Sequence, residues 1–384
     1  MRIAILTDEY PPASRGGSSI VTYREARAFV KRGHEVTVYC SSDGYQREAE
    51  GVRVFSVKAT YKNAWQTLYQ RDALRLAKED IIRWDPDIAH AHHITHRIGL
   101  SFASWCLKRY KTVITIHDAT WVVPGKVFPR RGGFAPTPLE ALLKYGRAYN
   151  PLLAVFSARL LARAHAVVFV SDDIRNYYEH HFGSHSNFHT VHNALELDEW
   201  PHQPFRSSEE VTMGFASRPG HDKGWFLFSS LVGALNSTGI PCRGSIISMK
   251  ESFDLMYAKL PSDLRPLIKF DGYITDDMKL RTWYDSLSCT FVGSLHLDPY
   301  PNVAIESLAT GRGVIVGPYT GSREIVDDRV GYVLDSREIL DPSSFAKQLA
   351  KKPPFENWSI HCREIRDRFD MDLHIKRLLE LYRG

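Results

Sequence analysis

Short runs of β-branched and other apolar residues alternate with helical patterns along the whole chain, and this alternation restricts the fold most. The runs expected to form strands cover residues 3–7, 35–40, 52–57, 87–92, 112–117, 167–171, 189–193, 211–217, 244–248, 268–273, 289–294, 313–317 and 331–334. Helical periodicity is clear in residues 20–32, 139–144, 151–164 and 226–235. Strands that alternate with helices predict an α/β fold of the doubly wound type, with parallel sheets covered on both faces.

The alternation occurs in two blocks, separated by a polar segment at residues 196–210 that carries Pro201 and Pro204 and is typical of a linker. A chain of 384 residues is too long for one ordinary core. We therefore expect two domains, at residues 1–200 and 201–370, with a final amphipathic helix at 371–384 that packs back on the first. Two such domains predict a cleft between the carboxyl ends of two sheets, where ligands bind.

Several classes of protein are not supported by the sequence. No stretch approaches the roughly 20 apolar residues of a membrane-spanning helix, and the first residues form a strand-like run without the shape of a signal peptide. The net charge of +5 suits an anionic ligand or membrane surface, but no nucleic-acid-binding motif accompanies it. The five cysteines form no CxxC pair, so neither a zinc site nor a disulfide framework is indicated. A reducing compartment, the cytoplasm, is therefore expected for this chain. The cysteines are Cys40, Cys106, Cys242, Cys289 and Cys362.

The segment from residue 291 to 311 combines a strand, a loop and a short helix. The helix is expected to start near Asn302, after Pro301, and to end at Gly311. The start of such a helix offers free N–H groups and a partial positive charge to a pyrophosphate. Asp298 and Glu306 add carboxylates that can accept bonds from sugar hydroxyls. From these residues alone, a loop-turn aspartate and a solvated helix glutamate are equally good interpretations.

Asp298-x7-Glu306, followed by Ser-Leu-Ala-Thr-Gly-Arg-Gly-Val-Ile-Val, resembles the E-x7-E signature of retaining glycosyltransferase family 4, which has the GT-B fold. The resemblance implies that Asp298 holds hydroxyls of the transferred sugar and Glu306 holds the ribose. It also implies that the backbone of Asn302 and Val303 contacts the phosphate or sugar. Aspartate replaces the first glutamate of the motif, so the reach at position 298 is one methylene shorter and the contact with the sugar is shifted or weakened.

A glycine-bounded loop with two cations follows the first strand of the second block. Arg218 and Lys223 stand between Gly214 and Gly224, and two cations can neutralise the two charges of a diphosphate. In isolation a solvated basic loop is the favoured interpretation. The loop resembles the family's G-R…K-G loop, and Thr320 to Glu324 resembles its Gly-Gly-x-x-Glu loop.

A glycine pair, Gly16 and Gly17, follows the first strand of the chain, and Ser18 or Ser19 is expected to cap the helix behind it. The family has a similar pair facing the donor phosphate and the acceptor, although an ordinary flexible turn fits these residues equally well. The pattern is not GxGxxG, so a dehydrogenase is not supported.

Histidines stand at the ends of two expected strands. His117 resembles the family's strand-end histidine, which implies a bond to the donor sugar or to the acceptor; a locally satisfied core histidine is the alternative. His90 and His92 are expected to point the same way and His93 away from them. Together with His96 these histidines form no familiar metal-binding spacing, so no metal is expected. Asp85-Pro-Asp87 is a formal DxD that is interpreted as a turn.

These motifs follow the family's order over nearly the whole chain. The resemblance implies a retaining glycosyltransferase that needs no metal or other cofactor, uses a nucleotide-sugar donor with UDP-sugars favoured, and serves cell-surface polysaccharide synthesis. Its acceptor would be a saccharide or a lipid-linked molecule. Its catalytic residues would be His117, Asp298, Arg218 and Lys223. Two alternatives stay open: a same-fold epimerase or phosphorylase, and a non-catalytic nucleotide-sugar-binding protein, the latter prompted by Asp298 and by Ala194 in place of the family's glycine.

The first block also carries basic residues among apolar helical patterns. Phe128-Pro129-Arg130-Arg131 precedes Gly132, Gly133 and two helical segments that carry Lys144, Arg147, Arg159 and Arg163. Such a surface fits peripheral contact with an anionic membrane or a lipid-linked acceptor, at the inner face of the membrane. An amphipathic helix packed on the domain explains the same pattern.

Overall fold

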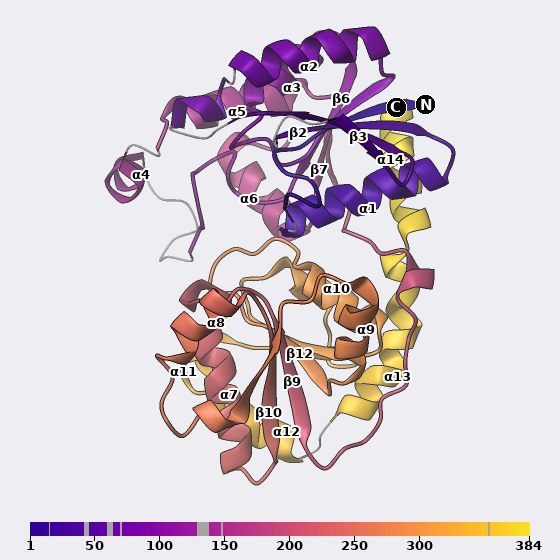
Figure 1. Cartoon of the computed structure of the whole chain (residues 1–384). Helices are drawn as coiled ribbons and strands as arrows, with labels where there is room; N and C mark the ends of the chain where they lie inside the picture. The colour runs from indigo at the N-terminus through magenta and orange to yellow at the C-terminus, as the bar shows by residue number, and fades with distance from the viewer. Residues whose placement is uncertain are drawn as a thin grey trace. The chain divides into compact units, whose positions relative to one another are not determined.

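The computed structural model describes residues 1–14, 16–41, 46–59, 64–69, 71–128, 138–146, 149–351 and 354–384. Two compact units make up the chain. The first unit comprises Met1–Glu196 together with Met371–Gly384, and the second unit comprises Leu197–Asp370 (Figure 1).

The first unit is built on one sheet with the strand order β3-β4-β2-β1-β5-β6-β7-β8. Its central strands are mostly apolar and buried, as expected of parallel strands covered on both faces. Their bounds are β1 Arg2–Leu6, β2 Glu35–Ser41, β3 Gln46–Ala49, β4 Val52–Val57, β5 Ile88–Ala91, β6 Lys111–Ile116, β7 Ala166–Phe169 and β8 Phe188–Thr190. Among these strands only β3 pairs antiparallel, with β4.

Helices cover this sheet, and the last helix of the chain is among them. Their bounds are α1 Gly17–Lys31, α2 Arg71–Trp84, α3 Leu100–Cys106, α4 Pro138–Tyr145, α5 Leu152–Arg163, α6 Asp172–Phe182 and α14 Met371–Arg383. Helix α14 lies beside α1 (Figure 1), and Tyr382 stacks on Phe29 with ring centroids 5.7 Å apart. The end of the chain therefore contributes to the core of the first unit.

The second unit is built on a parallel sheet with the order β11-β10-β9-β12-β13-β14. The strand bounds are β9 Val211–Ala216, β10 Cys242–Ile247, β11 Ile268–Gly272, β12 Cys289–Val292, β13 Gly313–Val316 and β14 Gly331–Val333. The helix bounds are α7 Trp225–Ser237, α8 Lys250–Tyr257, α9 Asp277–Asp285, α10 Asn302–Ala309, α11 Ser336–Leu340, α12 Pro342–Lys351 and α13 Phe355–Ile365.

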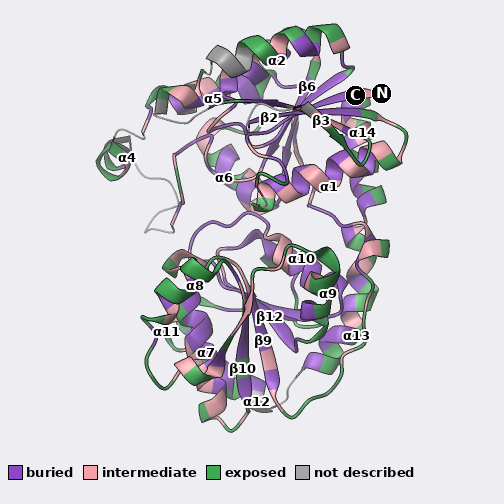
Figure 2. Ribbon diagram, viewed as in Figure 1, coloured by how far each residue is buried: buried purple, intermediate pink, exposed green. Residues whose placement is uncertain are grey.

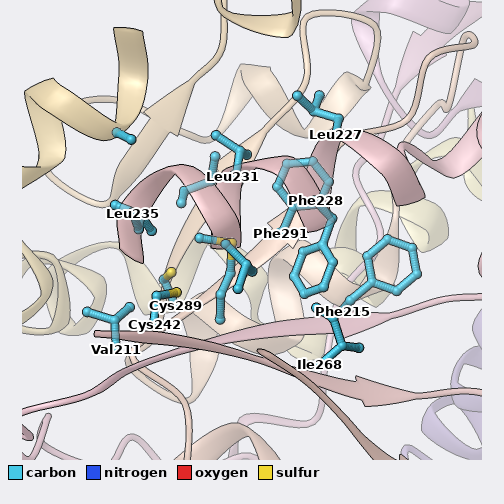
Figure 3. Packing of buried hydrophobic residues seen from close by; sticks show 14 of the residues in the cluster. Val211, Phe215, Leu227, Phe228, Leu231, Leu235, Cys242, Ile268, Cys289 and Phe291 are labelled. Carbon is cyan, nitrogen blue, oxygen red and sulfur yellow. The ribbon is translucent and has the colours of Figure 1, made fainter. Parts of the chain in front are cut away.

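The core of the second unit is formed where α7 packs on the sheet (Figure 3). Phe228 of α7 packs against Phe215 of β9 and Phe291 of β12, at centroid distances of 5.2 and 5.6 Å. Figure 2 shows the same arrangement as buried strands covered by helices whose outer turns are exposed. This packing fixes the carboxyl ends of β9 and β12, from which the candidate site is built.

Each strand expected from the sequence is present, with boundaries within a few residues. Strand β3 was not expected, because its sequence Gln-Arg-Glu-Ala is polar. It pairs with β4 through a tight turn in which Glu50 and Gly51 both have positive φ. Asn-Gly or Asp-Gly would have signalled this turn, but Glu-Gly does not.

The segment interpreted as a linker, residues 196–210, is held by the second unit over part of its length. The Gln203 N–H donates to the Thr310 carbonyl at 3.1 Å. His202 Nε2 lies 3.0 Å from the Ser359 carbonyl, to which it donates. Only Leu197–Glu199 forms a short 3-10 helix in this segment, and the residues around the two prolines pack on the unit without regular structure.

Candidate functional site

The order of strands in the second unit places a crevice between β9 and β12. The chain runs from β9 outward to β10 and β11, and then from β12 outward in the opposite direction to β13 and β14. The loops that leave the two central strands therefore diverge, and ligands of doubly wound sheets bind at this point. These loops are residues 217–224 and 293–301, which contain Arg218, Lys223 and Asp298.

The backbones of three loops meet at this edge of the sheet. Leu295 N–H donates to the Asp222 carbonyl at 2.8 Å, which joins the first loop to the second. Asp298 N–H donates to the Tyr319 carbonyl at 3.0 Å, and its own carbonyl accepts from Gly321 N–H at 2.8 Å, which adds the loop after β13. A Cβ on Gly224 would lie only 2.2 Å from the Gly293 carbonyl oxygen, so glycine is required at this approach.

Lys223 and Asp298 form an ion pair at the centre of these loops. Lys223 Nζ lies 2.5 Å from Asp298 Oδ2, and Ser294 Oγ donates to the same oxygen at 2.5 Å. Burial raises the pKa of Asp298, but the charges of Lys223 and His296 and the bond from Ser294 outweigh it, so the net pKa lies below its ordinary value. The carboxylate is thus ionised and almost buried, while the Lys223 side chain stays 26% exposed and can be reached by a ligand.

Arg218, the other cation of this loop, is placed differently. Its side chain is 64% exposed, and its nearest charged partner is Asp222, at 3.8 Å between Arg218 Nη2 and Asp222 Oδ2. The structure brings Lys223 and Asp298 together, but not Arg218 and Asp298. Arg218 thus has the freedom to close on a ligand, whereas Lys223 is already positioned.

Helix α10 begins at Asn302 after Pro301, as predicted, and Gly311 follows its end with φ of 88°. Its first turn carries the backbone N–H groups of Asn302 and Val303, four and five positions after Asp298 in the sequence. Glu306 is buried, and Tyr284 Oη donates to its Oε2 at 2.9 Å. This burial argues against a solvated helix glutamate. Tyr284, on α9, was missed because nothing in the sequence links it to Glu306.

The glycine pair of the first unit stands at the start of α1. Gly16 is the residue before the helix, and Gly17 is its first residue. The expectation that Ser18 or Ser19 caps this helix is wrong, because the helix starts before them and Ser19 Oγ donates to the Gly16 carbonyl at 2.9 Å. A Cβ on Gly17 would meet no atom within 4 Å, so packing among the described residues does not require glycine there.

His117 follows β6 directly and is partly exposed. Its Nε2 lies 3.0 Å from Nδ1 of His92. Burial lowers the pKa of His117 to about 4, so the imidazole is neutral at physiological pH. A neutral imidazole offers one donor and one acceptor, which suits a bond to a sugar hydroxyl.

The other strand-end histidines lie on the sides of the strand that the alternation of side chains predicts. His90 and His92 lie on one side with ring centroids 4.2 Å apart, and His93 lies on the other side against Asp118 and Asp8. Although burial lowers it, these carboxylates raise the pKa of His93 to about 9. Two metal-like groups therefore form, which spacing did not reveal because their carboxylates come from distant segments: Asp8–His93–His96 and Glu25–His90–His92.

In each group at least one donor is already engaged within the protein. The carboxylate of Asp8 accepts backbone N–H bonds from His96, Arg97 and Ile98 at 2.6–2.7 Å. A protonated His93 has no lone pair to offer a metal. Both ring nitrogens of His90 are engaged, by Tyr382 Oη at 2.7 Å and Thr115 Oγ1 at 2.8 Å. That no metal is needed stays a prediction.

Comparison with known proteins relates the chain to glycosyltransferases. Residues 15–199 match the model of Glycosyltransferase Family 4. An uncharacterized glycosyltransferase of Methanocaldococcus jannaschii is 25% identical over 354 residues, which cover 86% of this chain and 84% of that protein.

Solved structures show the same fold. Sucrose-phosphate synthase of Thermosynechococcus elongatus has a TM-score of 0.75 at 15% identity, covering 100% of this chain and 98% of that chain. HepE of Anabaena, in complex with UDP and glucose, has a TM-score of 0.69 at 15% identity, covering 99% of this chain and 98% of that chain. The comparisons confirm both the predicted family resemblance and the GT-B fold.

Proposed function

We propose, from the premise that this chain is a GT-B glycosyltransferase whose amino-terminal half matches family 4, that it transfers a sugar from a UDP-sugar with retention of anomeric configuration. The acceptor in this proposal is a saccharide or a lipid-linked molecule. The observation that carries it is the Lys223–Asp298 pair at the crevice between β9 and β12. Solved structures of HepE, which shares the fold, hold UDP and UDP-glucose.

The leaving group of this reaction is a diphosphate, which gains negative charge as the bond to the sugar breaks. Lys223, held by its backbone loop, supplies a fixed positive charge for the diphosphate. The solvent-exposed guanidinium of Arg218 adds a planar pair of hydrogen-bond donors. The N–H groups at the start of α10 act in the same direction. Charges that are in place before the reaction stabilise the transition state without reorganisation.

Asp298 has a second role in this proposal. Its Oδ2 accepts the hydrogen bonds from both Lys223 and Ser294. Its Oδ1 accepts no hydrogen bond from a described residue. That second oxygen faces a hydroxyl of the transferred sugar in our proposal. When the diphosphate draws Lys223 away, Oδ2 of the carboxylate can also accept a hydrogen bond from the sugar. The shorter aspartate thus serves both the lysine and the sugar.

The direct test mixes the protein with UDP-sugars and saccharide or lipid-linked acceptors, with and without EDTA. We expect release of free UDP, a product with the anomeric configuration of the donor by NMR, and no loss of rate with EDTA. An epimerase or phosphorylase acting on the same donor would release no UDP. A non-catalytic binding protein would bind the donor without turnover, and either result would overturn the proposal.

Replacing Tyr284 by phenylalanine tests the role of Glu306 in nucleotide binding. The change removes the hydroxyl that orients the buried carboxylate, at 2.9 Å from Oε2. A hydrogen bond to a charged group contributes about 1.5 kcal/mol or more, so we expect the Kd for UDP to rise about tenfold. Isothermal titration with UDP measures it.

Tyr257→Phe is the matched control for this change. Tyr257 Oη donates to the Arg265 carbonyl at 3.1 Å, in the same unit and remote from Glu306. We expect its Kd for UDP to equal that of the natural protein. Equal affinities of all three proteins for UDP would argue that Glu306 does not hold the ribose.

The exposed apolar side chains of the first unit suggest how the protein meets a lipid-linked acceptor. None of the described helices is long and apolar enough to cross a membrane. Leu142 and Leu143 on α4 are 52% and 78% exposed, and Leu152 and Val155 on α5 are about half exposed (Figure 2). Lys144, Arg159 and Arg163 add positive charge, so we propose peripheral contact with an anionic membrane. Arg130, Arg131 and Arg147, also assigned to this surface by sequence, lie outside the described residues.

Co-sedimentation with vesicles of phosphatidylglycerol tests this contact. The double substitution Leu142→Ser and Leu143→Ser is expected to weaken vesicle binding about tenfold, because two exposed leucines no longer enter the interface. Leu340→Ser, at a leucine of α11 that is 86% exposed, is the control and should bind as the natural protein does. Equal binding to uncharged phosphatidylcholine vesicles, or none to either, would remove the membrane proposal.

A further inference from the structure

A line of buried polar side chains joins the last helix of the chain to His117. His374 of α14 lies 3.0 Å from Glu25 Oε1 through its Nε2. Glu25 Oε2 lies 3.4 Å from His92 Nε2, and His92 Nδ1 lies 3.0 Å from His117 Nε2. Glu25, His92 and His374 are each at most 5% exposed, whereas His117 is partly exposed. His117 is therefore the end of the line that a ligand can reach.

The charge of each member follows from its surroundings. Burial raises the pKa of Glu25, but His92 and His374 outweigh it and the net pKa is lowered, so Glu25 is ionised. Burial and the neighbouring His90 hold the pKa of His92 well below its ordinary value, so His92 is neutral. His374 Nδ1 lies 2.8 Å from the His192 carbonyl and its Nε2 lies 3.0 Å from Glu25 Oε1, so both of its ring nitrogens face acceptors.

These charges determine where the protons are. A carboxylate can only accept, so the single proton of His92 lies on Nε2, facing Glu25. His92 Nε2 and Glu25 Oε2 lie 3.4 Å apart without forming a hydrogen bond, and neither atom bonds any other described residue. The negative charge of the carboxylate is therefore what favours the proton on Nε2. Nδ1 of His92 is then an acceptor, and the proton between His92 and His117 lies on Nε2 of His117. Nδ1 of His117 then carries no proton, and its lone pair can accept a hydrogen bond.

We propose that Glu25, His92 and His374 are positioning residues that hold His117 in the Nε2–H tautomer, so that its Nδ1 accepts a hydrogen bond from a sugar hydroxyl. This inference rests on the proposed function for the identity of the ligand, but not for the tautomer. It assigns His117 the role of an acceptor from substrate rather than that of a donor. It also gives the last helix of the chain a part in the site, through His374.

A second pair of buried contacts lies beside this line without joining it. Tyr382, also on α14, bonds His90, and His90 bonds Thr115. Both contacts are buried, and Tyr382 comes from the same helix as His374, but neither contact involves a nitrogen of His117 or His92. Tyr382→Phe therefore removes a comparable buried bond and leaves the contacts of the His92 and His117 ring nitrogens in place.

The tautomer of His117 can be read directly by two-bond ¹H–¹⁵N correlation NMR on the free protein, with His117→Gln used to assign the signal. We expect the Nε2–H tautomer in the natural protein. In Glu25→Gln the amide has one oxygen, which His374 occupies, so its NH₂ faces His92. His92 must then carry its proton on Nδ1, and His117 must shift to the Nδ1–H tautomer.

The kinetic result should follow the spectra. We expect kcat to fall about tenfold in Glu25→Gln, with KM for the donor changed less than about twofold, because one ligand bond is lost mainly in the transition state. Glu25→Asp, which keeps the carboxylate, should retain the Nε2–H tautomer, and Tyr382→Phe should retain both tautomer and kcat.

The outcomes separate this inference from the proposed function. An Nδ1–H signal for His117 in the natural protein would overturn the inference, even if Glu25→Gln does not fold. An unchanged tautomer in folded Glu25→Gln would also overturn it. Absence of sugar transfer with the expected tautomer in place would instead overturn the proposed function and leave the positioning of His117 standing.

Discussion

Replacing Lys223 by alanine is expected to lower turnover by about 10²- to 10³-fold, the usual effect of removing a fixed charge that stabilises a transition state. Two effects act together. The diphosphate loses the ammonium group that the loop after β9 holds in place. Asp298 also keeps its negative charge, almost buried beside the phosphates, with Lys223 no longer 2.5 Å away. Steady-state measurement of UDP release gives the value.

Two further variants make this experiment specific. Lys250→Ala removes an exposed lysine of the same unit, paired with Asp254 at 2.8 Å, and should leave turnover unchanged. Lys223→Ala combined with Asp298→Asn should bind UDP more tightly than Lys223→Ala alone, because the repelling carboxylate is gone. Near-normal turnover in Lys223→Ala would contradict the assignment of this loop to the donor.

Gly224→Ala is expected to have the second largest effect, through the backbone rather than through charge. Gly224 has a φ of 74°, and a Cβ there would lie 2.2 Å from the Gly293 carbonyl oxygen. The positive φ costs about 1 kcal/mol or more for alanine, and the contact forces the loop of Lys223 away from the loop of Asp298. We expect the free energy of unfolding to fall by about 3 kcal/mol in total.

Gly239→Ala separates these two contributions. Gly239 has a φ of 85°, but a Cβ there would meet no atom within 4 Å. We expect it to lose only the conformational part, about 1 kcal/mol in urea unfolding, and to bind UDP normally. Gly224→Ala should weaken UDP binding by at least about tenfold, because the cation is displaced from the phosphates. Equal losses of stability in the two variants, with UDP binding intact in both, would show that the contact between the loops has no part in the site.

The alternation of strands and helices could be predicted from the sequence because parallel strands are buried on both faces. Strands such as β13, Gly313–Val316, are apolar throughout and stand out from their surroundings. The start of α10 at Asn302 was equally visible, because proline and asparagine mark helix starts and Gly311 marks its end. Strand β3 could not be predicted, because pairing at the sheet edge, rather than hydrophobicity, defines it.

The candidate site was predicted residue by residue, but its internal contacts were not. Lys223 and Asp298 were each identified from a separate motif, and 75 positions separate them. Their ion pair depends on how far each loop extends beyond its strand, which no local pattern encodes. The same holds for Glu25 and His374, which lie 349 positions apart in the sequence and meet only because α14 packs beside α1.

A comparison of thermal unfolding in the presence of UDP-, GDP- and ADP-sugars, made with the natural protein and with Lys223→Ala, tests the donor site most directly. Ligand that binds only the folded state raises the unfolding temperature, and the stabilisation grows with the logarithm of the ligand concentration relative to its Kd. We expect a UDP-sugar to raise the unfolding temperature of the natural protein, and to raise that of Lys223→Ala little or not at all. An equal rise in both proteins, or no rise with any nucleotide sugar, would contradict a nucleotide-sugar donor held by Lys223.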